Sequence, residues 1–526
     1  MPLTAQAASA ADAPSTLVAT SLMTIYLLVI AVICFYGLHR YWMVILFARH
    51  RTKNNRPAGR LQTLPPVTIQ IPLFNEGAVA KRIIDAACQL KHPADLLQIQ
   101  VLDDSNDGSE DLVAQIVQHH HAQGINISHI RRPQRVGFKA GALEYGMKTA
   151  TGELIAIFDA DFVPHPSFLQ RTIHYFADPQ IGLVQTRWAH LNRQASLLTR
   201  SQAVFIDGHF VIEHTARNRG GAWINFNGTA GIWRRAAIEE AGGWEHDTLT
   251  EDVDLSYRAQ SKGWKFQYLP AITCPAELPP NITAFKSQQF RWTKGSIQVA
   301  IKLLPRIFRS DLPLLIKSEA FFHLTSPVVY LFITLFALLI YPTLLINVNP
   351  FGDTPLSGAL LGLSMFGMGT ASAGLFYLAS QWAQRRSVIQ TALMVPVLMA
   401  VGVGISLYNA LGVLEALAGK DSPFVRTKKY GDNPDQSLNL GLALRNLRPA
   451  DLPSFIPVMS LIELAMALYM LACITKLLTL ENAWMGLPFL ILFAAGYFYV
   501  AISGFLVTGK AILEQAATRQ TEPVPA

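Results

Sequence analysis

Acidic residues follow apolar β-type runs at two points of this sequence, where they could bind a cation or a phosphate. The run LIAIFDAD ends in Asp159 and Asp161, and the run LQIQVLDD ends in Asp103 and Asp104. Carboxylate oxygens are the ligands that hard divalent cations prefer, and such cations commonly bridge to phosphates. Because Asp-x-Asp also occurs in ordinary loops, the spacing alone leaves both interpretations open.

Two later motifs carry groups suited to sugar transfer. Thr250, Glu251 and Asp252 open an apolar-periodic stretch, where Thr250 is expected to cap a helix. A carboxylate held there could take the proton from an attacking hydroxyl, although simple N-terminal helix charge is the alternative. The motif QQFRW joins Arg291, suited to bidentate phosphate contact, to Trp292, which could pack on a sugar or belong to an interfacial aromatic belt.

Short β-rich runs alternate with helical patterns around these motifs. This alternation predicts a mostly parallel sheet with helices on both faces. Ligands of such sheets bind at the carboxyl ends of the strands, which is where the acidic residues collect. Strands are expected at 67–71, 97–102, 127–132, 154–161 and 182–188, with helices around 78–90 and from Ser109.

Apolar runs at both ends of the chain predict a multi-pass membrane protein. Charged residues make up 15% of the sequence, whereas soluble proteins have about a quarter. No acidic residue occurs from Pro14 to Asn75, and the basic residues there follow the first apolar run. This clustering marks the cytoplasmic side of a membrane. It therefore argues against reading the net charge of +7 as a sign of nucleic-acid binding.

Charge also predicts the topology of the later apolar segments, at about 320–348, 357–382, 388–417, 455–477 and 486–507. If all five crossed, the basic stretch 422–431 would lie outside, against the positive-inside rule. We therefore expect 388–417, which contains Pro396 and Asn409, to lie along or dip into the membrane. One helix before the soluble domain and four after it would then leave the C-terminus inside.

The ordered motifs LDD, DAD, TED and QxxRW resemble those of the processive family 2 glycosyltransferases. That family includes cellulose, hyaluronan and chitin synthases, and above all the plant cellulose-synthase-like glucan and mannan synthases. The stretches IPLFNE, GFKAGAL, FNGTAGIWRRAAIEEAGGW and GWKFQY support the likeness, and FVRTKK resembles a gating loop. The resemblance covers about 67–431 and implies an α/β GT-A-type cytoplasmic domain with an α-helical transmembrane region.

The resemblance further implies domains and residue roles. The domains would be 1–60 (first membrane helix and basic flank), 61–293 (glycosyltransferase), 294–319 (amphipathic interface helices) and 320–526 (membrane region with interfacial segment 388–417 and gating-type loop 422–431). Asp252 would be the general base beside Glu251, and Asp159 with Asp161 would hold Mg²⁺ or Mn²⁺. Donor contacts would be Pro72, Glu76, Asp104, Lys139, Asp159, Gln288, Arg291, Thr427 and Lys428. Acceptor contacts would be Trp292, Asn227, Gly228 and Thr229.

The implied activity is inverting β-transfer from a nucleotide-sugar to a growing polysaccharide that is translocated across the membrane. UDP-glucose is slightly preferred as the donor over GDP-mannose, and a bacterial inner or plasma membrane is the expected location. Membrane lipids and accessory export subunits or a second copy of the chain are the expected partners. Two alternatives stay open: addition of one sugar to a lipid, and a transporter with a nucleotide-binding domain. The sequence has no Gly-x-x-x-x-Gly-Lys-[Ser/Thr] phosphate loop, which counts against the second.

Overall fold

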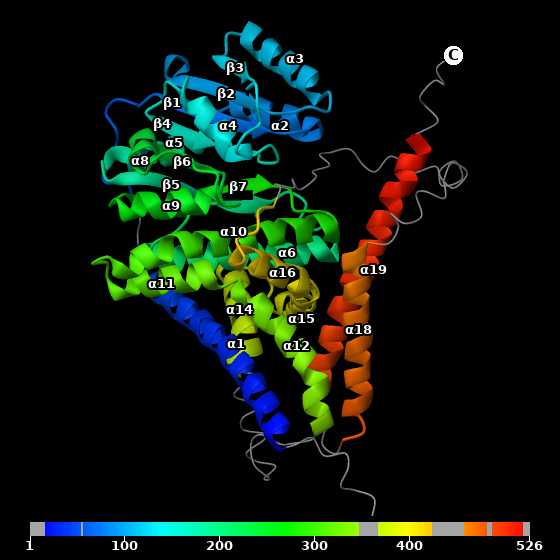
Figure 1. The fold of residues 1–526 in the computed structure, drawn as a ribbon. Coiled ribbons are helices and arrows are strands. Elements are labelled where there is room, and N and C mark those ends of the chain that lie inside the picture. Colours follow the sequence, from blue (N-terminus) through cyan, green and yellow to red (C-terminus); the bar gives the residue numbers. More distant parts are fainter. Residues whose placement is uncertain (1–15, 54–55, 347–366, 423–456, 481–485, 519–526) are drawn as a thin grey trace, which may run out of the picture.

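The chain is built of an α/β domain above a set of long apolar helices (Figure 1). A computed structural model describes residues 16–53, 56–346, 367–422, 457–480 and 486–518. The predicted Thr427 and Lys428, with most of the gating-type loop, lie outside these residues.

A seven-stranded mixed sheet forms the α/β domain, with the strand order β3-β2-β1-β4-β6-β5-β7. Six strands run in the same direction, and β6 runs antiparallel to both of its neighbours, β4 and β5. The strands are β1 (Val67–Leu73), β2 (Leu97–Asp103), β3 (Ile127–Ile130), β4 (Leu154–Ile157), β5 (Ile181–His190), β6 (Gly231–Arg234) and β7 (Lys265–Ala276).

All five predicted strands are present, as β1 to β5. The strands β6 and β7 were not predicted. The strand β6 has only four residues, too few to show a period. The strand β7 contains Pro270 and Pro275, and proline usually argues against a strand because it donates no ladder hydrogen bond. The mostly parallel fold class is confirmed, with β6 as its antiparallel member.

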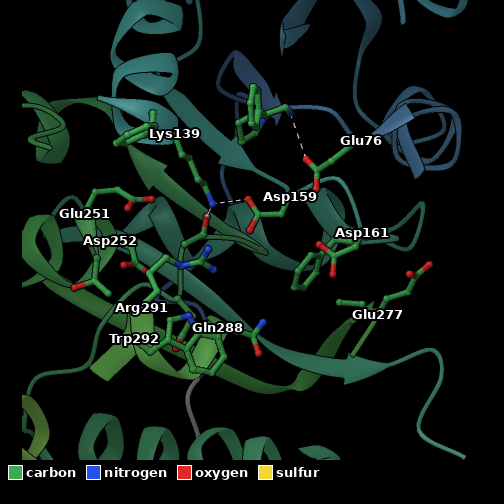
Figure 2. A pocket seen from close by; sticks show the side chains of 18 of the residues that line it. Glu76, Lys139, Asp159, Asp161, Glu251, Asp252, Glu277, Gln288, Arg291 and Trp292 are labelled. Carbon is green, nitrogen blue, oxygen red and sulfur yellow. Dashed lines mark hydrogen bonds and ion pairs between the residues drawn. The ribbon is translucent and has the colours of Figure 1, made fainter. Parts of the chain in front are cut away.

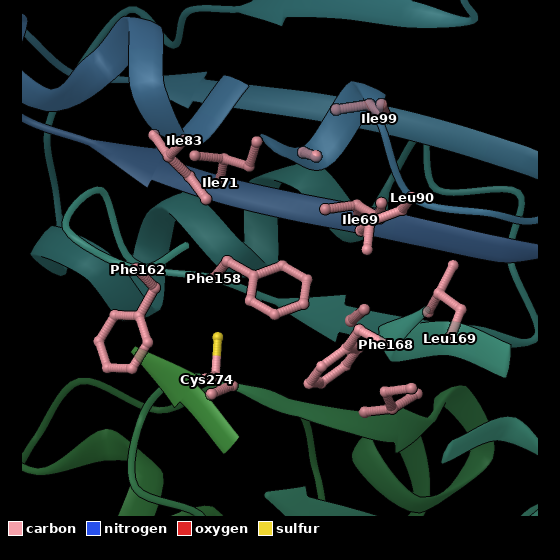
Figure 3. Packing of buried hydrophobic residues seen from close by; sticks show 14 of the residues in the cluster. Ile69, Ile71, Ile83, Leu90, Ile99, Phe158, Phe162, Phe168, Leu169 and Cys274 are labelled. Atoms are coloured by element: carbon pink, nitrogen blue, oxygen red, sulfur yellow. The ribbon is translucent and has the colours of Figure 1, made fainter. Parts of the chain in front are cut away.

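Apolar packing on both faces fixes the strands that carry the acidic motifs. Ile69, Ile71 and Phe158 are fully buried, and each such side chain contributes roughly 2 kcal/mol relative to exposure. The ring of Phe158 packs edge-on against Phe168, with centroids 5.0 Å apart (Figure 3). The domain's helices are α2 (Gly77–Cys88), η1 (Ala94–Leu96), α3 (Ser109–Ala122), α4 (Phe138–Met147), α5 (Phe168–Thr172), η2 (Ile173–Ala177), α8 (Arg235–Glu240) and α9 (Glu251–Ser261).

Helices at the base of the domain connect it to the membrane part (Figure 1). They are α6 (Leu197–Asp207), the π-helix η3 (Gly208–His214), α7 (Thr215–Gly220), α10 (Ile282–Arg309) and α11 (Leu314–Thr325). The QQFRW motif and the first part of the amphipathic segment expected at 294–319 lie in the single helix α10, and the rest of that segment reaches into α11. A Cβ atom on Gly295 would lie 2.5 Å from Cγ2 of Thr250. Glycine at this position therefore allows α10 to pack on the start of α9.

Among the residues that the structure describes, four helices are long and apolar enough to cross a membrane: α1 (Thr16–His50), α12 (Val328–Ile346), α18 (Val458–Leu477) and α19 (Leu487–Thr518). The helices α15 (Val388–Gly404) and α16 (Ser406–Leu417) meet at a bend of 46°, and the pair would be a fifth candidate if both helices belong to one span. The chain is a multi-pass membrane protein. That 388–417 does not cross stays a prediction. The expected segment 357–382 lies only partly within the described residues, which show η4 (Gly367–Ala371) and α14 (Ser372–Ala383) there.

Candidate active site

A pocket opens at the carboxyl ends of the strands, between the sheet and helices α9 and α10 (Figure 2). Figure 2 places Glu251 and Asp252 on one side, Asp161 and Glu277 on the other, and Arg291 between them. The predicted residues that line it are Pro72, Glu76, Asp104, Lys139, Asp159, Asp161, Asn227, Gly228, Glu251, Asp252, Gln288, Arg291 and Trp292. The sequence motifs, up to 220 residues apart, therefore converge on one cavity.

Thr229 differs from the other predicted acceptor residues because it lies behind the pocket wall. Its side chain is fully buried, and its hydroxyl accepts a hydrogen bond from the backbone N–H of Asp159 at 2.8 Å. Thr229 therefore supports the DAD backbone, and its role in shaping the acceptor pocket stays a prediction.

Lys139 is the positive centre of the pocket. Its ammonium forms an ion pair with Asp159 and donates to the carbonyl oxygen of Gly228 at 2.8 Å. The residues just before it, Gly137 and Phe138, have φ of +72° and +47°, and left-handed backbone of this kind is strained for a phenylalanine. Burial alone would lower the pKa of Lys139, but the carboxylates of Asp159 and Glu251 outweigh it and raise that pKa. Lys139 therefore stays charged.

Gly228 brings the loop between α7 and β6 close to both sides of the pocket. Its φ is +77°, and a Cβ atom there would lie 3.2 Å from Oδ2 of Asp252 and 3.3 Å from Nζ of Lys139. Only glycine adopts this backbone easily and leaves room for both groups. The FNGTAG motif thus places its backbone between the ammonium of Lys139 and the carboxylate of Asp252.

Glu251 and Asp252 begin helix α9, as predicted, but Thr250 does not cap it with its side chain. Burial, and then the neighbouring Glu251 carboxylate, raise the pKa of Asp252 to about 7 from 3.8. The pKa of Glu251 is also raised by burial, against the opposing effect of Lys139. A carboxylate that titrates near neutral pH is suited to act as a general base.

Helix α10 presents Gln288, Arg291 and Trp292 to the pocket at spacings of three and four, which place them on one face. Burial lowers the pKa of Arg291, and Glu251 followed by Asp159 opposes that shift. The guanidinium therefore lies in the field of the acidic residues. The ring of Trp292 lies 6.4 Å, centroid to centroid, from that of Trp188.

Sequence reasoning missed several pocket residues. Trp188 and His190 lie two residues apart at the end of β5, so they share a face. Their position at the end of a predicted strand could have indicated that they line the ligand edge of the sheet. Glu277 was missed because it follows the unpredicted strand β7. Arg135, whose guanidinium lies 3.4 Å from the ring centroid of Phe74, carried no sequence signal.

The residues of the pocket fit a divalent cation that is bound together with a diphosphate. Carboxylates outnumber cations in the pocket lining, where Lys139, Arg135 and Arg291 are joined by Glu76, Asp104, Asp159, Asp161, Glu251, Asp252 and Glu277. Bare diphosphate would be repelled by this excess, and a divalent ion would remove the repulsion. Asp159 and Asp161 supply hard oxygen ligands at a fixed strand end.

A second acidic group could also hold a metal ion, because oxygens of Glu245, Asp247 and Asp254 lie within 4.8 Å of one another. The ammonium of Lys302 contacts the three carboxylates at 2.6, 2.8 and 3.0 Å. A lysine therefore already supplies the positive charge there, and we assign the donor's cation to Asp159 and Asp161 as a proposal.

The fold and the pocket define a GT-A-like domain attached to long apolar helices. Residues 65–295 match the family described as "Glycosyltransferase like family 2". A probable glucomannan 4-beta-mannosyltransferase of Arabidopsis thaliana is 33% identical over 463 residues, which cover 85% of this chain and 79% of that protein. This chain belongs to the family 2 glycosyltransferases.

Other relatives are more similar over a shorter region. A probable glucomannan 4-beta-mannosyltransferase of Oryza sativa is 47% identical over 48% of this chain, and one of A. thaliana is 46% identical over 47%. The chain spans about half the length of these two relatives, 44% and 47%. A mannosyltransferase of Pyrobaculum calidifontis, solved with GDP-Man and Mn²⁺, shares the fold with a TM-score of 0.54 at 20% identity, over 76% of this chain and all of that one.

Two expectations find no support in these comparisons. The curated relatives named above are mannosyltransferases, so the slight preference for UDP-glucose has no basis in them. They are also plant proteins, so the expectation of a bacterial membrane is likewise unsupported.

Proposed function

We propose that this chain is a membrane β-mannosyltransferase that transfers mannose from GDP-mannose to a growing mannan-type polysaccharide. The observation that carries the proposal is the 33% identity to a probable glucomannan 4-beta-mannosyltransferase across 463 residues, together with a pocket lined by carboxylates, a lysine and an arginine suited to such a transfer. The solved mannosyltransferase bound to GDP-Man and Mn²⁺ motivates the choice of donor.

In the proposed reaction, the acceptor's hydroxyl attacks the anomeric carbon of the donor. Asp252 takes the hydroxyl proton, the new C–O bond forms, and the bond from the anomeric carbon to the diphosphate breaks with GDP as the leaving group. A single displacement inverts the anomeric centre, so no protein nucleophile is needed. The raised pKa of Asp252, to about 7, lets this carboxylate hold the proton at neutral pH.

Lys139 and Arg291 would stabilise the negative charge that grows on the diphosphate as this bond breaks. A cation on Asp159 and Asp161 would add Lewis-acid stabilisation of the same charge. Trp292, on the face of α10 that lines the pocket, would pack against the acceptor sugar, because aromatic faces suit the apolar faces of sugar rings.

The test is product formation by the full chain, purified in detergent, with GDP-mannose, GDP-glucose and UDP-glucose offered separately. The proposal expects a polymer labelled from GDP-mannose that a β-mannanase digests. A chloroform-soluble product alone would instead favour single addition to a lipid. Incorporation from UDP-glucose only would reject the mannosyl assignment. The variant Asp252→Asn is the control for transfer at this site.

Placement in the membrane is part of the proposal. We assign the α/β domain to the cytoplasmic side, because Arg49 lies in the last turn of α1 and Arg51 and Lys53 follow that helix, between it and the domain. The segment 388–417 would not cross, and the C-terminus would lie inside. Reporter fusions after residue 420 and at the C-terminus test this topology, and a C-terminal reporter found outside contradicts it. Translocation of the polymer, with accessory export subunits or a second copy of the chain, is the remaining expectation.

A further inference from the structure

Arg135 lines the pocket, but its guanidinium makes no hydrogen bond to the residues that the structure describes. Its Nε is buried without a partner. Oδ2 of Asp104 lies 3.9 Å from this nitrogen, which is too far for a hydrogen bond. A guanidinium carries five N–H donors and no acceptor. The proposed reaction does not use Arg135, so its donors are left for a ligand of the pocket.

The neighbouring Arg132 is engaged very differently. Its guanidinium donates to both carboxylate oxygens of Asp104, at 2.7 and 2.6 Å. It also donates to the backbone carbonyl oxygens of Val136 and Phe138, at 2.5 and 2.7 Å. Arg132 therefore fixes the loop that leads into α4 and balances the charge of Asp104. Arg135 is not needed for either purpose.

Two aromatic rings hold the guanidinium of Arg135. Its Cζ lies 3.4 Å from the ring centroid of Phe74 and 4.9 Å from that of Phe138, distances at which a cation is attracted to an aromatic face. Contacts of this kind use the faces of the planar guanidinium and leave the N–H groups along its edge. Because the rings restrict the side chain before a ligand arrives, little conformational entropy is lost when that edge binds.

The strand order indicates which part of a nucleotide would meet Arg135. At the edge where the pocket opens, β1 lies between β2 and β4. The proposed site for the cation and the diphosphate is just after β4, at Asp159, whereas Arg135 lies beside Asp104, just after β2, and over Phe74, just after β1. Neighbouring strands are about 4.8 Å apart, so Arg135 lies roughly 5 to 10 Å along the edge from the end of β4. A base reaches that far from its diphosphate across the ribose.

The base of the proposed donor suits the edge of a guanidinium. Guanine carries two acceptors side by side, N7 and O6, and an arginine contacts this pair with two N–H groups. On the corresponding edge, uracil has the acceptor O4 beside a carbon atom. A guanidinium with free donors therefore makes two hydrogen bonds to guanine where it makes one to uracil.

We propose that Arg135 recognises the guanine base of the donor by donating two hydrogen bonds, to N7 and O6, and so makes the pocket prefer GDP-sugars to UDP-sugars. Phe74 and Phe138 would hold the guanidinium for this contact, while Lys139 and Arg291 serve the diphosphate. The inference rests on the proposed function, because it requires a guanine nucleotide as the donor.

The test is calorimetric titration of the full chain, in detergent with Mn²⁺, with three nucleoside diphosphates offered separately. They are GDP, UDP and 7-deaza-GDP, which has a carbon atom in place of N7. For the unmodified protein we expect a Kd for UDP at least about tenfold above that for GDP, as for one bidentate contact. The Kd for 7-deaza-GDP should be about fivefold above that for GDP, as for one lost hydrogen bond.

The variant Arg135→Lys separates the planar fork from the positive charge, because lysine keeps the charge but has a single ammonium. We expect it to raise the Kd for GDP about tenfold and to change the Kd for UDP less than about twofold, so that the preference for GDP disappears. The retained UDP binding shows that the variant is folded. Arg171 of α5 is exposed and does not line the pocket, and Arg171→Lys is the matched control, expected to leave all three Kd values unchanged.

Three results would overturn the inference. An equal loss of GDP and UDP binding in Arg135→Lys would show that Arg135 contacts the diphosphate or shapes the pocket. Unchanged GDP binding in that variant, or equal binding of GDP and 7-deaza-GDP by the unmodified protein, would show that N7 is not read by this residue. Transfer from UDP-glucose alone by the unmodified protein is a different result, since it rejects the proposed function itself. Transfer from GDP-mannose with no change of preference in Arg135→Lys rejects only the role of Arg135.

Discussion

Replacing Asp252 by asparagine is expected to remove sugar transfer and, at the same time, to stabilise the protein. The pKa of Asp252 is raised from 3.8 to about 7 by burial and by Glu251, so the fold disfavours the ionised form. The corresponding stability is fully present below about pH 4 and is lost as the pH rises through 7. Asparagine has no charge to bury and keeps nearly the same shape.

The magnitude follows from the difference of about three pH units between 7 and 3.8. At about 1.4 kcal/mol per unit this corresponds to about 4 kcal/mol. Asp252 lines an open pocket, so water reduces the penalty, and we expect about 2 kcal/mol. That is a rise of about 4 °C in Tm.

The assay is thermal unfolding of the wild type and Asp252→Asn in detergent at pH 4.5, 6, 7 and 8, beside mannosyl transfer at the same pH values. The Tm difference should be small at pH 4.5 and grow to its full size by pH 8. Transfer by the wild type should rise with pH through about 7, and the variant should lose about a thousandfold. A Tm difference independent of pH, or a variant less stable than the wild type at pH 8, would refute the reasoning.

Four further outcomes are expected. Trp292→Ala should raise acceptor KM at least tenfold while slow hydrolysis of the donor persists, and an unchanged acceptor KM would contradict the stacking role. Lys139→Met should weaken GDP binding and lower kcat about a hundredfold, measured by calorimetry and radiolabel incorporation, and removal of divalent ions by a chelator should stop transfer until Mn²⁺ or Mg²⁺ is added. Lys302→Met leaves Arg258, which lies 2.7 Å from the buried Asp254, as the remaining cation beside the three carboxylates, so Tm should fall by a few degrees and millimolar Ca²⁺ should restore it. A calcium-independent Tm would show that the triad cannot replace its lysine by a metal.

The carboxylates of the candidate site could be located from sequence because each lies at the end of an element with a clear period. Asp159 and Asp161 follow the buried strand β4, which ends at Ile157, and Glu251 begins a helix. Parallel strands bring their carboxyl ends to one edge, so the motifs had to converge if the sheet formed. The long apolar helices α1 and α18 could also be predicted from the sequence, because length and composition are local properties.

The tertiary structure decided the relations between elements, which no local sequence pattern encodes. The neutral-range pKa of Asp252 depends on burial and on Glu251 in a folded pocket. The pairing of Lys139 with Asp159 depends on the left-handed backbone at Phe138. The imidazoles of His209 and His214, which contact the Asn227 amide, belong to a π-helix. An apolar period of 3.6 in the sequence does not reveal a π-helix. The sequence thus determined which groups are present at the edge of the sheet, and packing determined their charge, their orientation and their partners.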